Sequence, residues 1–259
     1  MSPDMNLSGT ERQNQILELL SRRPRITVAE ICSLYSVSVA TARRDLEALT
    51  NQGKVQRIHG GALPLRRAPP ELPVLQRQEN QAEEKIRIGQ AAAGLIQDGE
   101  TIFLGSGTTV LEIARHLPRE LHLTVITNSL PVVNELVDRT NIELIVIGGL
   151  LRQGEYSMIG HIAEQAVQEV RADRVFMGMR AVDTRHGFTN DYLPETMTDR
   201  AILNIASQIV VVVDHHKFGR VSSVLVGAIN AANIVITDQG TPQEYVDELR
   251  DKGVQVFVV

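Results

Sequence analysis

Three apolar stripes with helical spacing run through the first part of the chain. Two of them follow capping-box patterns at Thr10–Gln13 and Thr27–Glu30, in which a hydroxyl and a polar side chain three residues later satisfy the first backbone N–H groups of a helix. The stripes are Ile16, Leu19 and Leu20, and then Val28, Ile31 and Leu34. A third helix is predicted from Ser38, a good N-cap, to about Gln52, with Gly53 where a C-cap glycine belongs.

Beyond the third helix the pattern changes twice before it becomes regular again. Residues 54–62 predict a short hairpin, or wing, in which the pair Gly60–Gly61 bends the backbone. Residues 63–80 contain four prolines and are expected to form a semi-rigid linker. The sequence therefore predicts a small domain at residues 1–62, this linker, and a second domain at residues 81–259.

The second domain alternates between continuous apolar runs and helix-like stretches. The runs expected to be strands are Thr101–Leu104, Leu123–Thr127, Ile142–Ile147, Arg174–Met177, Ile209–Val213 and Ile234–Thr237. The expected helices include Val110–His116, Val132–Arg139, His161–Val170 and Pro242–Lys252. Alternation of this kind, with strands that are apolar on both faces, is typical of a mainly parallel sheet covered by helices on both sides. We therefore predict an α/β fold with a mainly parallel sheet.

The net charge of −5 is unevenly distributed between the two predicted domains. Residues 1–67 hold ten Lys and Arg against six Asp and Glu, a net charge of +4. Residues 68–259 hold sixteen against twenty-five, a net charge of −9. This asymmetry indicates a small polyanion-binding module joined to an acidic domain with another role. A solvated surface gives a milder split by chance, so charge only supports what the motifs indicate.

Cysteine content, the N-terminal residues and the apolar runs restrict the class of protein. Cys32 is the single cysteine, so no internal disulfide is expected and a reducing compartment fits best. Residues 1–8 are polar and lack the apolar core of a secretory signal. Apolar runs such as Ile209–Val213 are far shorter than the roughly 20 residues that a membrane span requires. We therefore expect a cytoplasmic protein without a membrane partner.

The third predicted helix has an exposed face suited to DNA. Its core face on a helical wheel is Val39, Ala42, Leu46 and Leu49. Ala40, Thr41 and Arg44 lie opposite, where small side chains permit close approach to a major groove and the guanidinium can bond guanine bidentately. Arg43 lies at the margin and is better placed for a phosphate. The expected DNA-binding set also includes Ser38, Lys54 and Arg57. An isolated Arg-Arg pair more often only solvates a helix, but the basic three-helix unit with its wing favours the DNA interpretation.

These residues resemble the DNA-binding half of the DeoR family of sugar-catabolism regulators. The matching stretches are Arg12-Gln13 with Ile16-Leu17, then Val37–Leu46, then Gly60–Ala62. The resemblance covers roughly residues 11–62 and implies a winged helix-turn-helix whose second helix reads the operator. Ala42 departs from the Ile or Val that is usual in the family. Because it lies on the core side of the wheel, it should affect packing rather than the reading face.

A turn rich in glycine and hydroxyl groups follows the first predicted strand of the second domain and opens a helix. It consists of Gly105, Ser106, Gly107, Thr108 and Thr109. Glycines let backbone N–H groups approach an anion closely, and the helix N-terminus adds a favourable dipole. The turn lacks the lysine of a Walker loop and the spacing of a dinucleotide fingerprint. It is a candidate phosphate cradle, the alternative being a turn without a ligand.

Further glycine and polar residues follow other predicted strands. They are Thr127, Asn128, Ser129, Gly148, Gly149, Gly178, Asp214 and Lys217. Because the carboxyl ends of parallel strands share one edge of a sheet, we expect these residues to converge with the glycine-rich turn on one effector pocket. Lys217 is the natural cation there for a phosphate or carboxylate, although a surface lysine in a turn is the alternative.

The second half of the chain resembles the C-terminal sensor domain of the same family. The matching stretches are Gly105–Thr109, Thr127–Ser129, Gly148–Gly149 and Asp214–Gly219. The resemblance implies a fold similar to ribose-5-phosphate isomerase and the CoA transferases, used for binding rather than turnover and without a cofactor. It also implies that the effector is a phosphorylated sugar or polyol, and that the protein is a repressor released by this effector.

One departure from the family pattern carries a hypothesis about the effector. The family usually reads Gly-(Ala/Val)-Asp-Gly-Ile-Asp where this chain has the stretch from Gly178 to Asp183, so Arg180 stands where an acidic residue is common. We expect the effector to carry an additional anionic group, or a bulkier one, near Arg180. Glu195 matches a glutamate of the family, although its neighbours differ.

Two other functions fit parts of the pattern. An isomerase of sugar phosphates needs a carboxylate base, for which Asp183, Glu195 and Asp214 are candidates, but it has no use for a winged helix. A nucleic-acid binder whose second domain only mediates assembly is the other alternative. His215 and His216 are adjacent and point in different directions on most backbones, so no metal site is expected. The prediction is a transcriptional regulator that binds double-stranded operator DNA, a small anionic sugar metabolite and further copies of itself.

Overall fold

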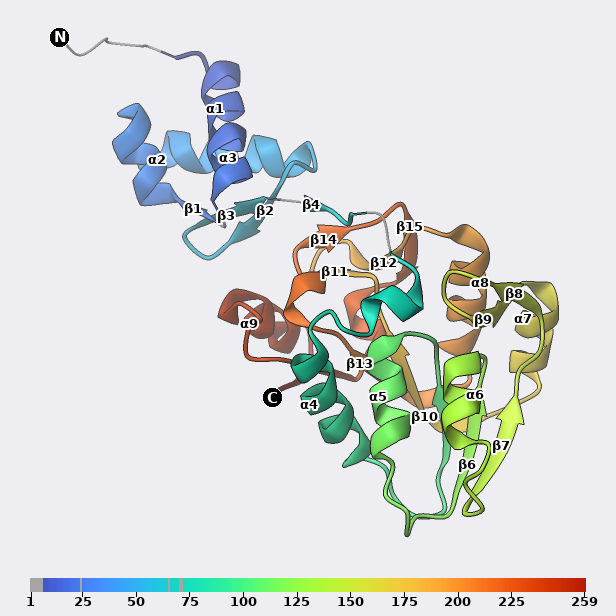
Figure 1. The fold of residues 1–259 in the computed structure, drawn as a ribbon. Coiled ribbons are helices and arrows are strands. Elements are labelled where there is room, and N and C mark those ends of the chain that lie inside the picture. The colour runs from blue at the N-terminus through green and yellow to red at the C-terminus, as the bar shows by residue number, and fades with distance from the viewer. Residues whose placement is uncertain (1–6, 24, 65, 70–71) are drawn as a thin grey trace. The chain divides into compact units, whose positions relative to one another are not determined.

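The chain divides into two units, residues 1–67 and 68–259. The computed structural model describes residues 7–23, 25–64, 66–69 and 72–259, and Figure 1 shows its ribbon. The unit boundary places residues 68–80 of the expected linker in the second unit. Parts of the expected N-terminal segment and of the proline-rich linker lie outside the described residues: 1–6, Leu65, Pro70 and Glu71.

The first unit is a three-helix bundle with a small antiparallel sheet. Its helices are α1 (Gly9–Arg22), α2 (Val28–Tyr35) and α3 (Val39–Asn51). Its strands are β1 (Ile26–Thr27), β2 (Val55–Ile58), β3 (Gly61–Pro64) and the short β4 (Arg66–Arg67). The hairpin β2–β3 is the predicted wing, and β1 pairs with its inner strand. The predicted winged helix-turn-helix is confirmed, and its core contains Ile16, Leu20, Ile31, Leu46 and Leu49.

Three details of these helices were predicted wrongly. The N-cap of α1 is Ser8 rather than Thr10, because the Ser8 hydroxyl accepts the Glu11 backbone N–H at 3.3 Å. Leu34 and Val39, both expected on apolar core faces, are each 51% exposed. A helical wheel gives the direction of a side chain but not how far along the helix the core extends. Leu34 is the penultimate residue of α2 and Val39 is the first residue of α3. Both therefore lie beside the turn that joins the two helices.

A buried ion pair joins α1 to α3. The Arg12 Nε donates to Asp45 Oδ2 at 2.6 Å, and its Nη2 donates to Asp45 Oδ1 at 3.1 Å. Both residues are buried, with 9% and 4% of their surface exposed. The carboxylate holds the pKa of Arg12 above its ordinary value. The pair is bidentate, so it fixes the angle between the two helices as well as neutralising both charges.

The second unit is built on a seven-stranded parallel sheet, counted over the described part of the chain, in the order β17-β16-β13-β10-β5-β6-β7. The strands are β5 (Thr101–Leu104), β6 (Leu123–Thr127), β7 (Ile142–Val146), β10 (Ala172–Gly178), β13 (Ala206–Val212), β16 (Ile234–Thr237) and β17 (Gln255–Val258). All six predicted strands are present, and β5, β6 and β16 agree with the prediction at both ends. The predicted α/β fold is confirmed.

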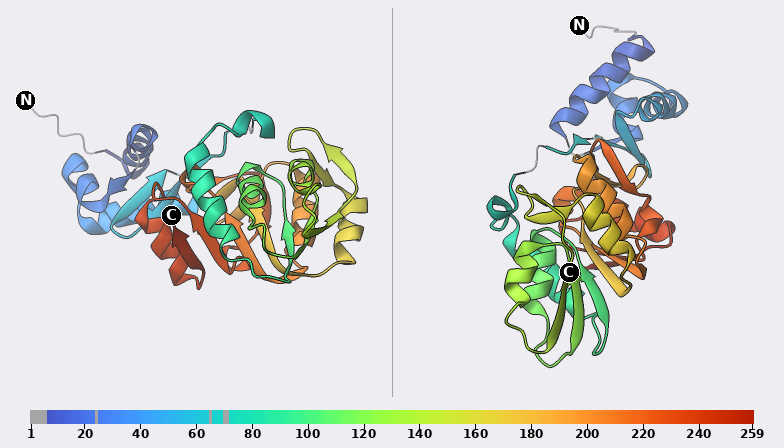
Figure 2. Two further views of the ribbon diagram at one scale, coloured as in Figure 1. Left: turned by 60° about the horizontal axis from the view of Figure 1, so that its bottom comes forward. Right: turned by 90° about the vertical axis from the view of Figure 1, so that its right-hand side faces the viewer.

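Helices lie on both sides of this sheet (Figures 1 and 2). They are α4 (Ala82–Ala93), α5 (Thr108–His116), α6 (Leu130–Leu136), α7 (His161–Gln168), α8 (Leu193–Ile202) and α9 (Gln243–Asp251). The main core forms where α4, α5 and α6 bury apolar side chains such as Ile88, Ile113 and Val132 against sheet residues such as Phe176 of β10. The helices α4 and α8 and the strand β17 were not predicted.

Short strands that do not belong to the parallel sheet lie beyond the carboxyl ends of its strands (Figure 1). A three-stranded sheet in the described residues has the order β11-β12-β15, and β8 pairs with β9 in a hairpin. Their bounds are β8 (Leu150–Arg152), β9 (Ser157–Ile159), β11 (Ala181–Asp183), β12 (Gly187–Asn190), β14 (Arg220–Val221) and β15 (Val224–Gly227). The described part of this unit also contains three short 3-10 helices: Val74–Arg77, His215–Lys217 and Ile229–Ala231. Among the described helices, none has the length and apolar character needed to span a membrane.

Candidate effector cavity and nucleic-acid interface

The predicted DNA-reading face belongs to the first turns of α3. Ser38 caps the helix, accepting the Thr41 backbone N–H at 3.2 Å. Ala40, Arg43 and Arg44 are exposed, whereas Thr41 is half-buried and its hydroxyl lies 2.9 Å from that of Ser38. The two guanidinium groups and the small Ala40 are therefore the accessible part of this face.

The remaining residues expected to bind DNA lie in or beside the wing. Lys54 is exposed and directly precedes β2. Arg57 is half-buried within β2, so it is less accessible than Lys54. Ala42, where the family usually has a larger residue, is fully buried in the core, as expected from the wheel.

The glycine-rich turn of the second unit connects β5 to the N-terminus of α5. Gly107 is the N-cap and has φ +115°, a conformation that favours glycine, and no side chain of the described residues caps the helix. Gly105 packs closely against β10, since a Cβ atom there would stand 3.3 Å from the Phe176 carbonyl oxygen. The first backbone N–H groups of α5 are thus left for a ligand or water, and the helix dipole favours an anion.

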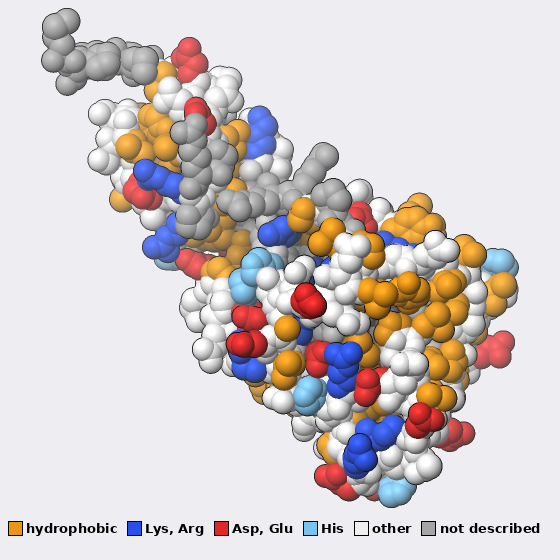
Figure 3. All heavy atoms as spheres, viewed as in Figure 1, with side chains coloured by type: hydrophobic (Ala, Val, Ile, Leu, Met, Phe, Trp, Pro, Cys, Tyr) orange, Lys and Arg blue, Asp and Glu red, His pale blue; other side chains and the backbone are white. Residues whose placement is uncertain are grey.

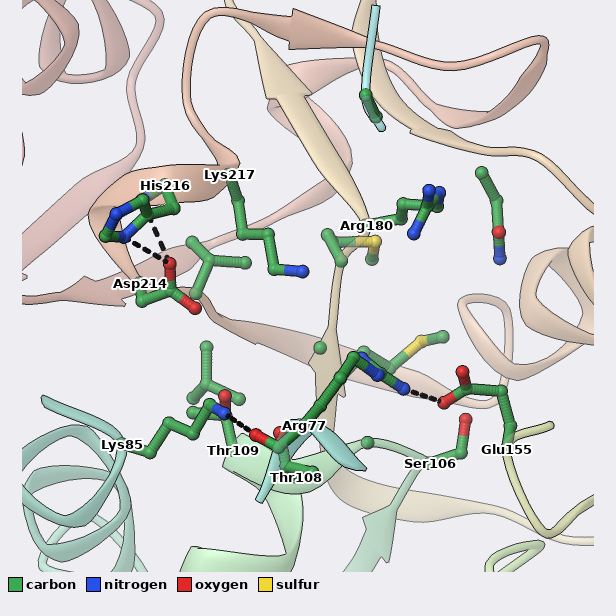
Figure 4. A pocket seen from close by; sticks show the side chains of 18 of the residues that line it. Arg77, Lys85, Ser106, Thr108, Thr109, Glu155, Arg180, Asp214, His216 and Lys217 are labelled. Atoms are coloured by element: carbon green, nitrogen blue, oxygen red, sulfur yellow. Dashed lines mark hydrogen bonds and ion pairs between the residues drawn. The ribbon is translucent and has the colours of Figure 1, made fainter. Parts of the chain in front are cut away.

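A cavity of about 250 Å³ lies at this helix N-terminus. It receives residues that follow three adjacent strands of the sheet, namely β5, β10 and β13. Nine of the predicted effector-binding residues line it: Ser106, Gly107, Thr108, Thr109, Gly178, Arg180, Glu195, Asp214 and Lys217. Figure 4 shows Lys217, Lys85 and Arg180 approaching the cavity from different elements.

The cavity side formed by α4 and the helix His215–Lys217 is cationic. Lys85 of α4 is only 5% exposed, and its Nζ donates to the Arg77 carbonyl oxygen at 2.5 Å. Burial lowers the pKa of Lys85 to about 8, an effect that nearby Asp214 partly offsets. Asp214 is itself buried and caps its helix by accepting the His216 backbone N–H at 2.9 Å. Lys85 and Lys217 thus face a space next to the open N-terminus of α5.

The opposite side of the cavity is acidic and densely hydrogen-bonded. Glu195 of α8 forms an ion pair with Arg152 and accepts the Ser157 hydroxyl at 3.0 Å. The Asn190 side-chain amide donates to Glu195 and to Asp199, each at 3.2 Å. Burial raises the pKa of Asp199 to about 7. This network presents carboxylate and amide groups that can bond the hydroxyls of a polar ligand.

Arg180 reaches the cavity from the loop between β10 and β11. It is 8% exposed, and its Nε lies 2.8 Å from Asp191 Oδ2. The guanidinium also donates to the Pro69 carbonyl oxygen. An anionic group of a ligand near Arg180 therefore meets a guanidinium that already has protein partners.

Seven predicted effector-binding residues do not line the cavity: Gly105, Thr127, Asn128, Ser129, Gly148, Gly149 and Asp183. The Thr127 hydroxyl instead donates to the Leu104 carbonyl oxygen at 2.6 Å, and the Asn128 side chain donates to the Met158 carbonyl oxygen at 3.0 Å. Thr127, Asn128 and Ser129 lie at the end of β6, and Gly148 and Gly149 follow β7, the edge strand of the sheet. The hairpin β8–β9 is bonded to this region, since the Met158 N–H donates to the Asn128 carbonyl oxygen at 2.7 Å.

Two further residues of this group have local structural roles. A Cβ atom on Gly149 would stand 2.8 Å from the Ile159 carbonyl oxygen, so the glycine allows β9 to approach. Asp183 is fully buried, and its Oδ1 accepts the backbone N–H groups of Arg185 at 3.0 Å and His186 at 2.9 Å. Of the residues expected to converge on one pocket, the cavity therefore collects residues after β5, β10 and β13 and not those at the ends of β6 and β7.

Several polar cavity residues were not found from the sequence. They are Arg77, Asn80, Gln81, Lys85, Glu155, Asn190, Asp199, His216 and Arg220. One signal was available: Glu195 and Asp199 are four residues apart and so share a face of α8. Lys85 gave no such signal, because a lysine in an amphipathic helix is ordinarily exposed. Within the described residues no group of three or more His, Cys, Asp or Glu is placed to hold a metal ion.

A winged helix-turn-helix followed by an α/β unit with a charged cavity defines a ligand-responsive transcriptional regulator. The family model for the DeoR-like helix-turn-helix domain matches residues 12–67, and the model for the DeoR C terminal sensor domain matches residues 80–239. The chain belongs to the DeoR family. It is a DNA-binding transcriptional regulator and not an enzyme.

Full-length relatives support this assignment. The chain is 34% identical over 261 residues to a putative aga operon transcriptional repressor of Escherichia coli O157:H7, an alignment that covers 100% of this chain and 97% of that one. It is 33% identical over 250 residues to the glycerol-3-phosphate regulon repressor of Escherichia coli K12, covering 96% of this chain and 99% of that one.

Similarity to solved structures is more limited. Ribose 5-phosphate isomerase A of Methanocaldococcus jannaschii aligns with 54% of this chain and 55% of its own at 20% identity, with a TM-score of 0.40. An alignment at this level supports no functional conclusion. The parallel α/β architecture stands on the strand pairing described above.

Proposed function

We propose that this protein represses a carbohydrate-catabolism operon and that a phosphorylated sugar or related anionic metabolite, bound in the cavity, releases it from the operator. The observation that carries the proposal is the open N-terminus of α5, which borders a cavity of about 250 Å³ together with Lys85 and Lys217. Two relatives have names that point the same way, one to the aga operon and one to the glycerol-3-phosphate regulon.

The charge distribution of the cavity fits a ligand with two chemically different ends. A phosphate suits the cationic side, where the helix N–H groups and two ammonium groups supply donors and positive charge. Sugar hydroxyls suit the acidic side, where Glu195, Asn190 and Asp199 offer acceptors and an amide donor. A second anionic group near Arg180 would share this guanidinium with Asp191 and Pro69, because a guanidinium carries five N–H donors.

We propose further that the regulator acts as a homo-oligomer in the cytoplasm. Two copies would present their α3 helices to half-sites about one helical turn of DNA apart, or a multiple of it. The second unit has an apolar face that suits contact between copies, with exposed Leu150, Ile162, Leu193 and Met197 from β8, α7 and α8. Figure 3 shows apolar side chains gathered over this part of the second unit.

Two measurements test the effector and the DNA halves of the proposal. Thermal shift with a panel of sugar phosphates, each paired with its unphosphorylated sugar, should identify ligands whose stabilisation requires the phosphate. Fluorescence anisotropy with DNA from upstream of the protein's own gene should show salt-sensitive binding that such a ligand weakens. An assay for ligand turnover in the same samples separates binding from catalysis. If no fragment binds with or without metabolites, the proposal is wrong.

The homo-oligomer is tested by sedimentation of the full chain. Leu193→Lys places a charge on the exposed apolar face without touching the cavity, and we expect it to shift the protein toward the monomer. The same substitution at an exposed position elsewhere, Gln255→Lys on β17, should leave the mass unchanged. A monomeric wild-type protein at micromolar concentration would contradict the proposal.

A further inference from the structure

One wall of the cavity includes residues from the described parts of the segment that precedes α4, residues 68–69 and 72–80, which we call the connector. In the sequence it directly follows Arg67, the last residue of the first unit. Connector residues that line the cavity are Ala68, Pro69, Leu72, Arg77 and Asn80. Its backbone is fastened to the second unit, because the Ala68 N–H donates to the Val221 carbonyl oxygen at 3.1 Å and the Val74 N–H to that of Gly154 at 2.7 Å.

Two cavity cations hold backbone carbonyls of this connector. Lys85 Nζ donates to the Arg77 carbonyl oxygen at 2.5 Å, a bond drawn as a dashed line in Figure 4. Arg180 donates to the Pro69 carbonyl oxygen. Both acceptors are neutral, and both cations also face the space in which an anionic ligand would bind. The same donors therefore serve the connector and the cavity.

A ligand anion competes favourably for these donors. A hydrogen bond between a cation and an anionic oxygen is roughly twice as strong as one between neutral groups. The bond between a cation and a neutral carbonyl has an intermediate strength. Lys85 has three N–H donors, so it can keep its hydrogen bond to the Arg77 carbonyl oxygen while it also bonds a ligand. Arg180 differs in geometry rather than in number of donors, because its five N–H groups belong to one rigid planar guanidinium. A ligand that displaces this group therefore moves the donors that bond Asp191 and Pro69 together. Loss of the Pro69 bond removes one contact at the end of the connector next to the first unit, where the bond from the Ala68 N–H to the Val221 carbonyl oxygen remains.

We propose that the connector is the element by which the cavity controls the DNA-binding unit, and that Arg180 is the positioning residue that holds it. With the cavity empty, Arg180 fastens Pro69. An anionic ligand draws Arg180 away, the backbone at residues 68–69 loses this contact, and the connector becomes less ordered. This inference rests on the proposed function in one respect, the anionic character of the effector.

The first experiment uses the full chain without any ligand and follows amide hydrogen exchange of Ala68. Arg180→Ala should raise the exchange rate of Ala68 at least about tenfold, because one charge-assisted bond no longer fastens the adjacent carbonyl. Arg180→Lys keeps the positive charge but loses the planar fork of donors. Its Ala68 exchange rate should therefore lie between those of Arg180→Ala and the wild type. Arg185→Ala is the matched control, since Arg185 is exposed and does not line the cavity. An Ala68 rate in Arg180→Ala equal to that of the control overturns the inference.

The second experiment adds inorganic phosphate or glycerol 3-phosphate to the wild-type chain, with sulfate-free chloride at equal ionic strength as the reference. Binding is followed by thermal shift and connector release by exchange at Ala68. Binding together with faster exchange supports the inference, and Arg180→Ala should then show no further acceleration. Binding with unchanged exchange overturns the inference and leaves the proposed function standing. If neither probe binds and the panel of sugar phosphates described above also gives no thermal shift, the proposed function is contradicted, and with it the competition at Arg180.

Discussion

Replacing Lys85 by Met should make the protein more stable while it weakens the cavity as an anion site. Lys85 is 5% exposed, and burial lowers its pKa from an ordinary value of 10.5 to about 8. One pKa unit corresponds to about 1.4 kcal/mol, so keeping this ammonium charged at pH 7 costs the folded state on the order of 3 kcal/mol. Methionine keeps the length of the side chain but loses a hydrogen bond worth about 1 kcal/mol or somewhat more. We therefore expect a net gain of about 1–2 kcal/mol in the free energy of unfolding at pH 7.

The pH dependence distinguishes this mechanism from a general packing effect. Between about pH 8 and pH 10.5 the unfolded chain carries the Lys85 proton and the folded chain does not. The free energy of unfolding of the wild type should therefore rise with pH across this window, and the Met variant should lack that rise. Asp214 and Glu112 face the ammonium and oppose the lowering of its pKa, whereas Arg77 and Lys217 add to it. The advantage of the variant should accordingly shrink toward pH 10.

Urea unfolding at pH 7 and pH 10, followed by far-ultraviolet circular dichroism, measures both quantities; the chain has no Trp for fluorescence. The transition of interest is that of the second unit, which carries Lys85. Lys252→Met is the matched control, because Lys252 is exposed, and it should change stability by less than about 0.5 kcal/mol. The same samples should show phosphate affinity at least about tenfold weaker in Lys85→Met. A variant that is less stable than wild type at pH 7, or that keeps the wild-type rise with pH, refutes this reasoning.

Three further substitutions test separate features of the fold and the DNA face. Asp45→Ala leaves a buried guanidinium without its partner and should destabilise the first unit by about 3–5 kcal/mol in thermal unfolding. Gly89→Ala places a Cβ atom 2.6 Å from a side chain of α5 and should lower stability by about 1–3 kcal/mol, whereas Gly94→Ala, with 3.5 Å to its nearest atoms, should be nearly neutral. Arg44→Ala should weaken operator binding by about 1–3 kcal/mol and relax base choice at one position, while Lys54→Ala should weaken all sequences alike and reduce the salt dependence.

Local signals in the sequence were sufficient for the architecture of the first unit. The capping box at Thr27 and Glu30 forms as predicted, with the Thr27 hydroxyl accepting the Glu30 N–H at 3.1 Å. Gly53 adopts φ +64° directly after the C-cap of α3. Such signals act over three or four residues and need no knowledge of the rest of the fold. The buried pair of Arg12 and Asp45 could not be found in this way, because its two members lie 33 residues apart.

The cavity shows where local signals stop being sufficient. The sequence located strands correctly but not their order in the sheet, and the order decides which strand ends meet. The residues after β5, β10 and β13 face one cavity because these strands are neighbours in the centre of the sheet. The residues after β6 and β7 lie at one edge, beneath the hairpin β8–β9. Lys85 and Arg77 were missed for the same reason. They belong to no local motif, and only the tertiary fold brings them to the cavity.

The bonds that cavity cations make to the protein have a consequence for regulation. A site whose cations were fully available would bind an anion equally well in every arrangement of the chain, and such binding shifts no equilibrium. Because Arg180 bonds Pro69 through a rigid guanidinium, ligand binding that displaces this group breaks a contact of the connector. The affinity lost in breaking that contact is the coupling free energy available for control, and typical couplings of about 1–3 kcal/mol match one charge-assisted hydrogen bond. By reciprocity, operator DNA that favours the fastened connector must weaken effector binding by the same factor, so the two binding equilibria measured on one sample check each other.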